Sequence, residues 1–264
     1  MRLCDKEVSP IGLGTWGMGG GFWTPDYSND DAYVSAIRYA YERGIRLFDT
    51  AEMYGGGHTE ELVGRALRDF LDDVLIVSKV WPNHLHYDDL VRSAEASRRR
   101  LGVRSIDLYL IHWPNRDVPL SESIRALEDL VDRGVIRCFG VSNFDARLLE
   151  EAVSTAKKYE VVADEVEYSV YNRWPERDLI PLARRLGVTI IAYSPLGRGS
   201  VASDRRLAEI GKKYGRTPVQ VALNYLMRSS IPIPKSSRKE HIDEIVGSMG
   251  WSLSDEDAAV ISRL

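Results

Sequence analysis

The sequence predicts an α/β fold, a (β/α)8 TIM barrel in which residues 1–264 form a single domain with short C-terminal helices. Eight short apolar segments alternate along the chain with amphipathic segments of helical period. Each unit takes roughly 25 to 35 residues, and eight units in about 250 residues is the size of a closed barrel. Most of these strands have apolar middles, as parallel strands covered on both faces require. An open, doubly wound sheet is the alternative.

The first predicted strand ends in a glycine-rich loop. Three glycines within Ile11–Gly17 have the spacing of the dinucleotide fingerprint. That fingerprint binds phosphate only where a helix begins at its glycines. Three more glycines and Pro25 follow, so no helix can start there. We therefore interpret the match as a coincidence.

The remaining elements alternate regularly, and turn residues mark their limits. Asp30 is placed to cap the first helix, and Gly44 ends it. Predicted helices cover 30–44, 59–70, 87–102, 121–134, 145–159, 176–187, 204–214 and 217–229. Predicted strands cover 46–51, 74–80, 105–113, 136–143, 161–168, 188–195 and 230–237, and two short helices close the chain. The loops are short, and no stretch resembles a linker between domains.

Composition excludes several classes of partner. A net charge of -4 and a pI near 5.8 argue against nucleic acid or an anionic membrane as the main partner. No apolar run approaches the ~18 residues of a membrane span, and the first residues lack a signal core. Cys4 and Cys138 lie far apart in sequence and outside metal-ligand spacings. We expect reduced thiols in a soluble, cytoplasmic monomer.

Polar residues stand where the predicted strands end. In a barrel, the C-terminal ends of the strands form the active-site face. The polar residues at these ends are Asp49, Lys79, His112, Ser142, Asn143, Glu165, Glu167, Tyr193, Ser194, Lys235 and Ser236. Lys79 ends an apolar strand, where an ammonium group needs a partner, and Asp49 on the neighbouring strand can supply it.

Tyr54 completes a set that suits carbonyl chemistry. It follows Asp49 by five residues, on a loop with three consecutive glycines. A phenol has a pKa of about 10, and a nearby ammonium makes it a better proton donor. His112 could donate a hydrogen bond to a substrate oxygen, although taken alone it is better interpreted as a core histidine. The set lacks a nucleophile activated by a base, so acyl transfer is disfavoured.

A metal site is the weaker interpretation of the histidines. His84 and His86 have the His-x-His spacing of some barrel hydrolases, and Asp49 and His112 could add ligands. However, both follow Pro82 in a loop beyond the strand end. We therefore predict a polar loop and no catalytic metal.

The sequence resembles the aldo-keto reductase superfamily over essentially its whole length. The matching motifs, in chain order, are G-T-W (14–16), D-T-A-E-M-Y-G (49–55), S-K-V (78–80), L-I-H-W-P (110–114), G-V-S-N-F (140–144), V-E-Y (166–168), Y-S-P-L-G (193–197) and I-P-K-S (233–236). The resemblance implies a barrel that binds NADPH in extended form, without a Rossmann domain, and reduces aldehydes or ketones to alcohols. It implies Tyr54 as general acid, tuned by Lys79 and Asp49, with His112 orienting the carbonyl.

The resemblance also implies a cofactor site along the strand ends. At the nicotinamide end it implies Thr15, Trp16, Asp49, Ser142, Asn143, Glu165 and, stacking beneath the ring, Tyr193. For the pyrophosphate it implies Ser194, Leu196 and Gly197. For the 2′-phosphate and adenine it implies Lys235, Ser236, Ser237, Arg238, His241 and Glu244; a Lys/Arg/Ser cluster suits a phosphate dianion.

Three positions depart from the family pattern. Asp164 and Glu165 stand where the family often has Asn-Gln, and an ionised Glu165 could accept from a carboxamide nitrogen but not donate to its oxygen. His241 stands in place of a frequent arginine, and Ile245 in place of a frequent asparagine. These changes leave NADH use open.

The expected substrate is a small-molecule carbonyl compound. Trp23, Trp81 and Trp113, with Tyr54 and His112, are predicted to line its pocket, and Phe22 could join them. The segment after the last strand is short, so we expect an open pocket that accepts many aldehydes. The alternative function is an NADP(H)-binding regulatory or auxiliary subunit with little turnover. A metal-dependent hydrolase is a third possibility, and it predicts that a chelator abolishes activity.

Overall fold

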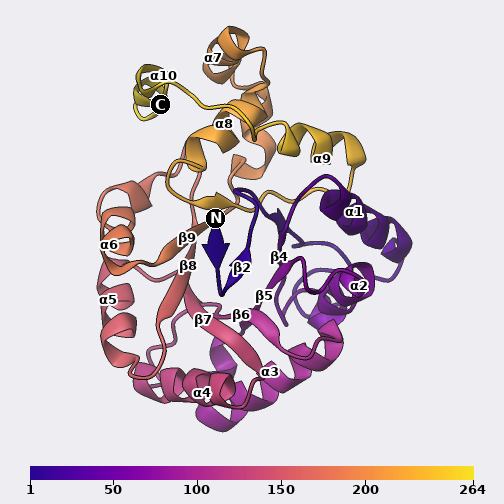
Figure 1. Ribbon diagram of the computed structural model, residues 1–264, viewed down its shortest axis with the longest axis vertical. Helices are drawn as coiled ribbons and strands as arrows, with labels where there is room; N and C mark the ends of the chain where they lie inside the picture. The colour runs from indigo at the N-terminus through magenta and orange to yellow at the C-terminus, as the bar shows by residue number, and fades with distance from the viewer.

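The computed structural model describes all 264 residues and confirms the barrel. Its eight parallel strands follow one another in the order β3 to β10. Figure 1 labels β4 to β9 in the middle of the molecule. They are β3 (Leu13–Gly14), β4 (Leu47–Asp49), β5 (Leu75–Val80), β6 (Ile106–Ile111), β7 (Ile136–Ser142), β8 (Val161–Glu167), β9 (Thr189–Tyr193) and β10 (Ile231–Pro232). The first and last strands meet, because Gly14 pairs with Lys235 in parallel and its N–H donates to the Pro234 carbonyl at 3.1 Å. The sheet is therefore closed, and the open-sheet alternative is wrong.

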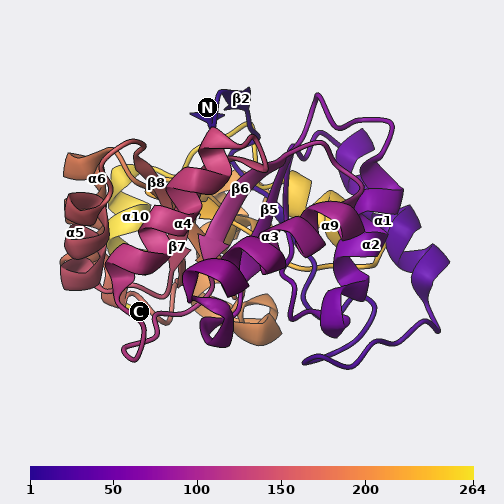
Figure 2. The ribbon, with the colours of Figure 1, turned by 90° about the horizontal axis from the view of Figure 1, so that it is seen from below.

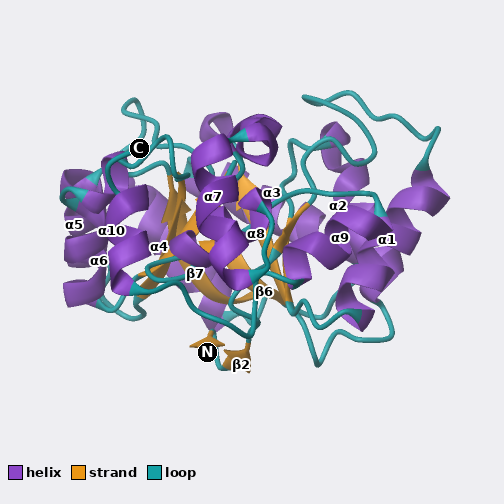
Figure 3. Ribbon diagram, turned by 90° about the horizontal axis from the view of Figure 1, so that it is seen from above, coloured by secondary structure: helices purple, strands orange, loops and turns teal.

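Helices surround the strands (Figure 3). They are α1 (Asp30–Glu42), α2 (His58–Leu67), α3 (Tyr87–Leu101), α4 (Leu120–Asp132), α5 (Ala146–Thr155), α6 (Leu179–Leu186), α7 (Arg205–Tyr214), α8 (Pro218–Leu226), α9 (Lys239–Val246) and α10 (Asp255–Ile261). Figure 1 shows α7 and α10 lying outside the ring, beyond α8. α8 begins with a capping box, in which Thr217 and Gln220 satisfy each other's backbone N–H groups.

Helix α6 starts later than the sequence analysis predicted. Trp174–Glu176 form a 3-10 turn, and the α-helix begins only at Leu179. A start at Glu176 would place Pro181 inside the helix, where it lacks the N–H for an i→i−4 bond. In the observed helix Pro181 lies in the first turn, where no such bond is needed.

A short N-terminal hairpin was not anticipated from the sequence. β1 (Arg2–Leu3) pairs antiparallel with β2 (Lys6–Glu7), and the two turn residues between them have positive φ angles. Figure 2 shows the hairpin projecting at one end of the barrel. Lys6 Nζ donates to the carbonyls of Leu71 at 2.7 Å and Val74 at 2.6 Å and pairs with Asp107 at 2.9 Å. The hairpin thus covers the N-terminal ends of the strands.

The expectation of reduced thiols is wrong. Cys4, in the hairpin turn, and Cys138, on β7, form a disulfide with their Cα atoms 5.8 Å apart. The hairpin brings the two cysteines together although 134 residues separate them. A cross-link over so long a loop restricts the unfolded chain strongly.

The apolar core has two large parts and a small third cluster of Ala51, Met53 and Tyr54. A cluster of 57 buried residues fills the space between strands and helices. A smaller cluster of 11 fills the barrel interior below the site, including Leu47, Leu75, Leu108 and Ile191, with Leu3 of the hairpin. No helix combines the length and the apolar composition that crossing a membrane requires.

Asp164 is an exception within this core. Its neighbours Ala163 and Val166 belong to the inner and outer clusters respectively, so alternation along β8 places Asp164 on the helix side. It is fully buried, and neither carboxyl oxygen has a hydrogen-bond partner. Burial raises the pKa of Asp164 well above its usual value, although the nearby N–H of Phe144 acts in the opposite direction. The folded protein therefore holds this carboxyl in its neutral form.

Asp164→Asn should stabilise the protein at pH 8 by about 2 kcal/mol, because a buried group no longer has to stay protonated. With a raised folded pKa, the wild type loses stability as the pH rises above the unfolded value of about 3.9. The gain should therefore shrink towards pH 4.5. Chemical denaturation at both pH values measures it, and an equal gain at both would contradict the assignment.

Candidate active site

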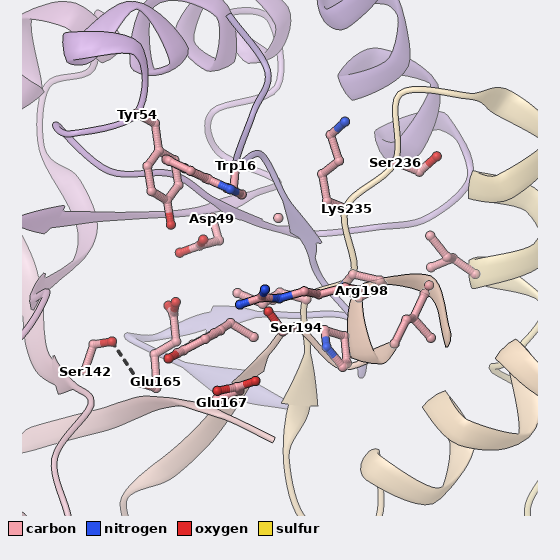
Figure 4. Close-up of a pocket in the computed structure, with 18 of the residues that line it drawn as sticks. Trp16, Asp49, Tyr54, Ser142, Glu165, Glu167, Ser194, Arg198, Lys235 and Ser236 are labelled. Atoms are coloured by element: carbon pink, nitrogen blue, oxygen red, sulfur yellow. Dashed lines mark hydrogen bonds between the residues drawn. The ribbon is translucent and has the colours of Figure 1, made fainter. Parts of the chain in front are cut away.

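A cavity of about 750 Å³ opens at the C-terminal ends of the strands, away from the hairpin. Strand-end residues predicted from the sequence line one part of it: Asp49, His112, Ser142, Asn143, Glu165, Glu167 and Tyr193. Figure 4 shows several of these side chains converging below Tyr54. The cavity lies where barrels carry their active sites.

Lys79 is the centre of a buried charge cluster. It is 0% exposed, and its Nζ bonds Asp49 Oδ1, the Thr50 carbonyl at 3.0 Å and Glu165 Oε1 at 3.3 Å. Asp49 is on the neighbouring strand β4, whereas Glu165 comes from β8, three strands away in the sheet order. The cluster therefore spans the interior of the barrel and joins its two sides.

The pKa shifts in the cluster follow from burial and from these contacts. Burial opposes the charged form of Lys79, but Asp49 and Glu165 outweigh it and raise the pKa of the ammonium. Burial raises the pKa of Asp49, and Lys79 opposes that rise. Burial raises the pKa of Glu165 well above its usual value, and the charge of Asp49 adds to the rise. The lysine thus stays charged, while at least one carboxyl favours its proton.

Tyr54 lies over this cluster, on the loop between β4 and α2. Lys79 Nζ is 5.3 Å from the centroid of its ring. The following glycines allow the loop to pack closely: a Cβ on Gly55, at φ 57°, would lie 2.4 Å from the Gly19 carbonyl oxygen. Burial raises the pKa of Tyr54 above its usual value, although Lys79 acts in the expected opposite direction. The phenol is therefore protonated at neutral pH and able to donate.

His112, at the end of β6, is neutral. Burial and the charge of Lys79 lower the pKa of His112 to about 2. Its ring packs edge-on against Trp81, with centroids 5.3 Å apart, and against Tyr54 at 5.9 Å. A neutral imidazole offers one N–H donor. Since His112 also lines the cavity, it can hydrogen-bond a bound oxygen.

A hydrogen-bond network ties the ends of neighbouring strands together. Ser142 Oγ donates to the Glu165 carbonyl at 2.8 Å (Figure 4). Asn143 Nδ2 donates to the His112 carbonyl at 3.0 Å, and its Oδ1 accepts from the Tyr193 hydroxyl at 2.8 Å. Thr15 does not line the cavity; its hydroxyl donates to the Asp49 carbonyl at 2.7 Å. These bonds fix the positions of the strand ends around the cavity.

The other end of the cavity is basic. Predicted residues that line it are Ser194, Leu196, Lys235, Ser236, His241 and Glu244, joined by Ile245. Burial lowers the pKa of Lys235, whose ammonium has no protein partner. Three predicted residues, Gly197, Ser237 and Arg238, do not line the cavity, and Arg238 Nε lies 3.7 Å from Glu240.

Arg198 was not predicted as a site residue from the sequence. It lines the cavity between two glycines of the segment after β9, with φ at 55°, and Figure 4 shows its side chain extending into the space. The sequence signal was available, because a cation beside the predicted pyrophosphate segment suits an anion.

Aromatic side chains form the mouth of the cavity. Trp16, Phe22, Trp81 and Trp113 line it. Trp23 does not, but packs edge-on against Trp81 with centroids 6.1 Å apart.

The two histidines considered as metal ligands are engaged elsewhere. His84 Nδ1 bonds Glu52 Oε1 at 2.9 Å, which also accepts from the Trp81 N–H, and His86 Nδ1 lies 3.3 Å from Glu122.

Known proteins are similar to this chain in sequence and fold. The model of the Aldo/keto reductase family matches residues 10–264. A thermostable aldo-keto reductase, Tm1743, solved with the inhibitor epalrestat, is 46% identical with a TM-score of 0.93, over 98% of this chain and 96% of that one. An aldo/keto reductase from Klebsiella pneumoniae, solved with NADP and acetate, is 33% identical with a TM-score of 0.90, over 97% and 91%. Methylglyoxal reductase YeaE of Escherichia coli strain K12 is 31% identical over 98% of this chain and 92% of its own length.

Lys79→Met should lower both activity and stability. It removes the only cation from two buried carboxyls, which destabilises by about 3 kcal/mol when one partner of a buried pair is lost. We expect activity to fall by at least about 100-fold, because the cavity then loses the ammonium that favours ionisation of the Tyr54 phenol. Denaturation and steady-state assays measure the two effects. In the double variant Asp49→Asn, Lys79→Met, stability should recover in part while activity does not; an unchanged Lys79→Met protein would refute the role of the cluster.

Proposed function

The chain belongs to the aldo/keto reductase family and is an NADP(H)-dependent oxidoreductase of aldehydes or ketones, and from this premise we propose a role for each residue of its site. Tyr54 is the general acid, Lys79 and Asp49 tune it, and His112 orients the substrate carbonyl. One observation carries this proposal: the buried cluster around Lys79 lies below a protonated phenol and a neutral imidazole that face the same cavity.

The cavity has the features that an extended dinucleotide requires. Glu165 Oε2 is a buried acceptor without a partner at one end, and Lys235 is a cation without an ion pair at the other. Arg198, also without an ion pair, extends into the cavity from the loop after β9 (Figure 4). Tyr193 would stack beneath the nicotinamide, with Ser142, Asn143 and Glu165 at its carboxamide. Ser194, Leu196, Gly197 and Arg198 would hold the pyrophosphate. Lys235 and Ser236 would bind the 2′-phosphate, with help from Ser237, Arg238 and His241, and Glu244 the adenine.

The chemistry divides between cofactor and protein. When bound, NADPH supplies a hydride to the carbonyl carbon. His112 donates a hydrogen bond to the carbonyl oxygen, and Tyr54 gives that oxygen its phenolic proton as negative charge develops. Lys79 stabilises the tyrosinate that remains. Because burial keeps the phenol protonated, its proton is present before the substrate arrives.

The substrate proposal rests on the mouth of the cavity. Trp16, Phe22, Trp81 and Trp113 line this mouth. They offer apolar contact to a substrate tail and no charged group to bind it. We propose broad acceptance of aldehydes, including small ones, since two relatives are named methylglyoxal reductases. The auxiliary-subunit alternative is not favoured by relatives that are named reductases. That the protein is a monomer in the cytoplasm stays a proposal. The expectation of reduced thiols no longer supports a cytoplasmic location, because Cys4 and Cys138 form a disulfide.

Tyr54→Phe should lower kcat for reduction of an aromatic aldehyde such as 4-nitrobenzaldehyde by about 10²- to 10⁴-fold, because the general acid is lost. Absorbance of NADPH measures the rate. Tyr159→Phe is the matched control, because this hydroxyl bonds Asp132 on the outer surface. Retained turnover in Tyr54→Phe would refute the assignment of the acid.

Lys235→Met should raise the KM for NADPH by roughly 10- to 100-fold while leaving the KM for NADH nearly unchanged, because the charge-assisted bond to the 2′-phosphate is lost. Steady-state assays with both cofactors measure the ratio. Lys239→Met serves as control, since its ammonium lies 5.1 Å from the Tyr39 ring and outside the cavity. An equal effect on both cofactors would place the 2′-phosphate elsewhere.

A further inference from the structure

The cluster around Lys79 holds one more carboxyl group than its charge balances. Lys79 contributes one positive charge, and Asp49 and Glu165 can contribute two negative ones. The side chains of all three are at most 3% exposed. A second uncompensated negative charge in such surroundings is strongly disfavoured, so a proton held between the carboxyls is the favoured state.

The geometry of the two carboxyls agrees with a shared proton. Figure 4 shows the carboxyl groups of Asp49 and Glu165 pointing towards one another. Both carboxyls contact the same Lys79 Nζ, so their oxygens lie close together, and a hydrogen bond between them requires one of the two to keep its proton. Such a pair titrates as a unit, and its proton belongs to neither residue alone.

No cation other than Lys79 forms an ion pair with either carboxyl of the pair. Tyr54, from the loop after β4, and Tyr193, from β9, face Glu165 and are neutral. Glu167, two residues along β8, lines the same cavity and is acidic. The cation Arg198 reaches this part of the cavity from the loop after β9, where it acts on Tyr193.

Glu165 also faces the space assigned to the nicotinamide. It lines the cavity, and its Oε2 atom is buried without any hydrogen-bond partner in the protein. Asp49 lines the cavity too, but its Oδ1 is already bonded to Lys79. Glu165 is therefore the member of the pair that senses a charge on the cofactor.

We propose that Asp49 and Glu165 share one proton beside Lys79 while the reduced cofactor is bound, and that Glu165 releases this proton when the cofactor carries the positive charge of its oxidised form. The inference rests on the proposed cofactor site and deepens it. Glu165 then links the redox state of the cofactor to a proton.

During turnover all protons move between groups of the site, and the net charge of the site does not change. Hydride leaves the cofactor with two electrons, and a C–H bond forms at the substrate carbon, which is reduced as the cofactor is oxidised. Tyr54 gives its proton to the substrate oxygen. A proton of the Lys79 ammonium then passes to the Tyr54 oxygen, and the shared carboxyl proton replaces it on Lys79. The carboxyl pair changes from one negative charge to two while the cofactor ring gains one positive charge, so the net charge of the buried site is constant.

Equilibrium binding tests the proposal without turnover. Isothermal titration calorimetry of the wild-type protein with NADP⁺ and with NADPH, at pH 7.5 in phosphate and in Tris, gives the protons exchanged from the dependence on buffer enthalpy. We expect NADP⁺ to release nearly one proton more than NADPH. The 2′-phosphate, with a pKa near 6, titrates in both cofactors and cancels in this difference. At pH values below the pKa of the pair, each unit of increase in pH should strengthen NADP⁺ binding about tenfold relative to NADPH binding.

Two substitutions assign the proton to its residue. Glu165→Gln keeps the size of the side chain and supplies a neutral amide, so both cofactors should bind and the difference in proton release should vanish. Glu167→Gln, on the same strand and in the same cavity, should keep the difference. A difference that persists in Glu165→Gln would overturn the proposal.

The wild-type protein alone also decides the matter if Glu165→Gln does not fold. Equal proton release by both cofactors, with a pH-independent ratio of Kd values, would overturn the inference and leave the reductase function intact. Failure of both cofactors to bind would overturn the cofactor site and the inference with it.

Discussion

The buried ammonium of Lys79 is the interaction on which the active site depends. A charge at 0% exposure persists only where carboxylates and carbonyls surround it. Lys79 therefore holds Asp49 of β4 and Glu165 of β8 at one point inside the barrel. Tyr54 and His112 lie around that point. Burial and the ammonium both lower the pKa of His112, whereas burial raises the pKa of Tyr54 against the effect of the ammonium. Fold and chemistry are thus coupled through one side chain.

Much of this arrangement could be predicted from the sequence, because the signals are local. Alternation of apolar and amphipathic segments predicted the strands, and polar residues at their ends predicted the face that carries the site. The pairing of Lys79 with Asp49 followed from neighbouring strands, and the structure pairs β4 with β5 in parallel. The late start of α6 could also have been predicted, since Pro181 was visible.

The remaining features depend on contacts that no local pattern encodes. Glu165 reaches Lys79 from three strands away, which depends on the curvature of the closed sheet. The hairpin strands have two residues each, too few to show a period, and the disulfide followed from the hairpin. The pKa of Tyr54 rises because burial outweighs the ammonium, a balance that residue types alone do not give.

The hairpin and its disulfide lie at the opposite end of the barrel from the cavity. The Met1 ammonium donates to the Val8 carbonyl at 3.3 Å, and the disulfide holds the hairpin turn against β7. The other chain end, after α10, lies on the outer shell beyond α8 (Figure 1). For immobilisation on a bead or an electrode, the carboxyl end is therefore the better anchor. A tether at the carboxyl end would apply force to the peripheral helix α10. A tether at the amino end would apply force to the hairpin that covers the N-terminal ends of the strands.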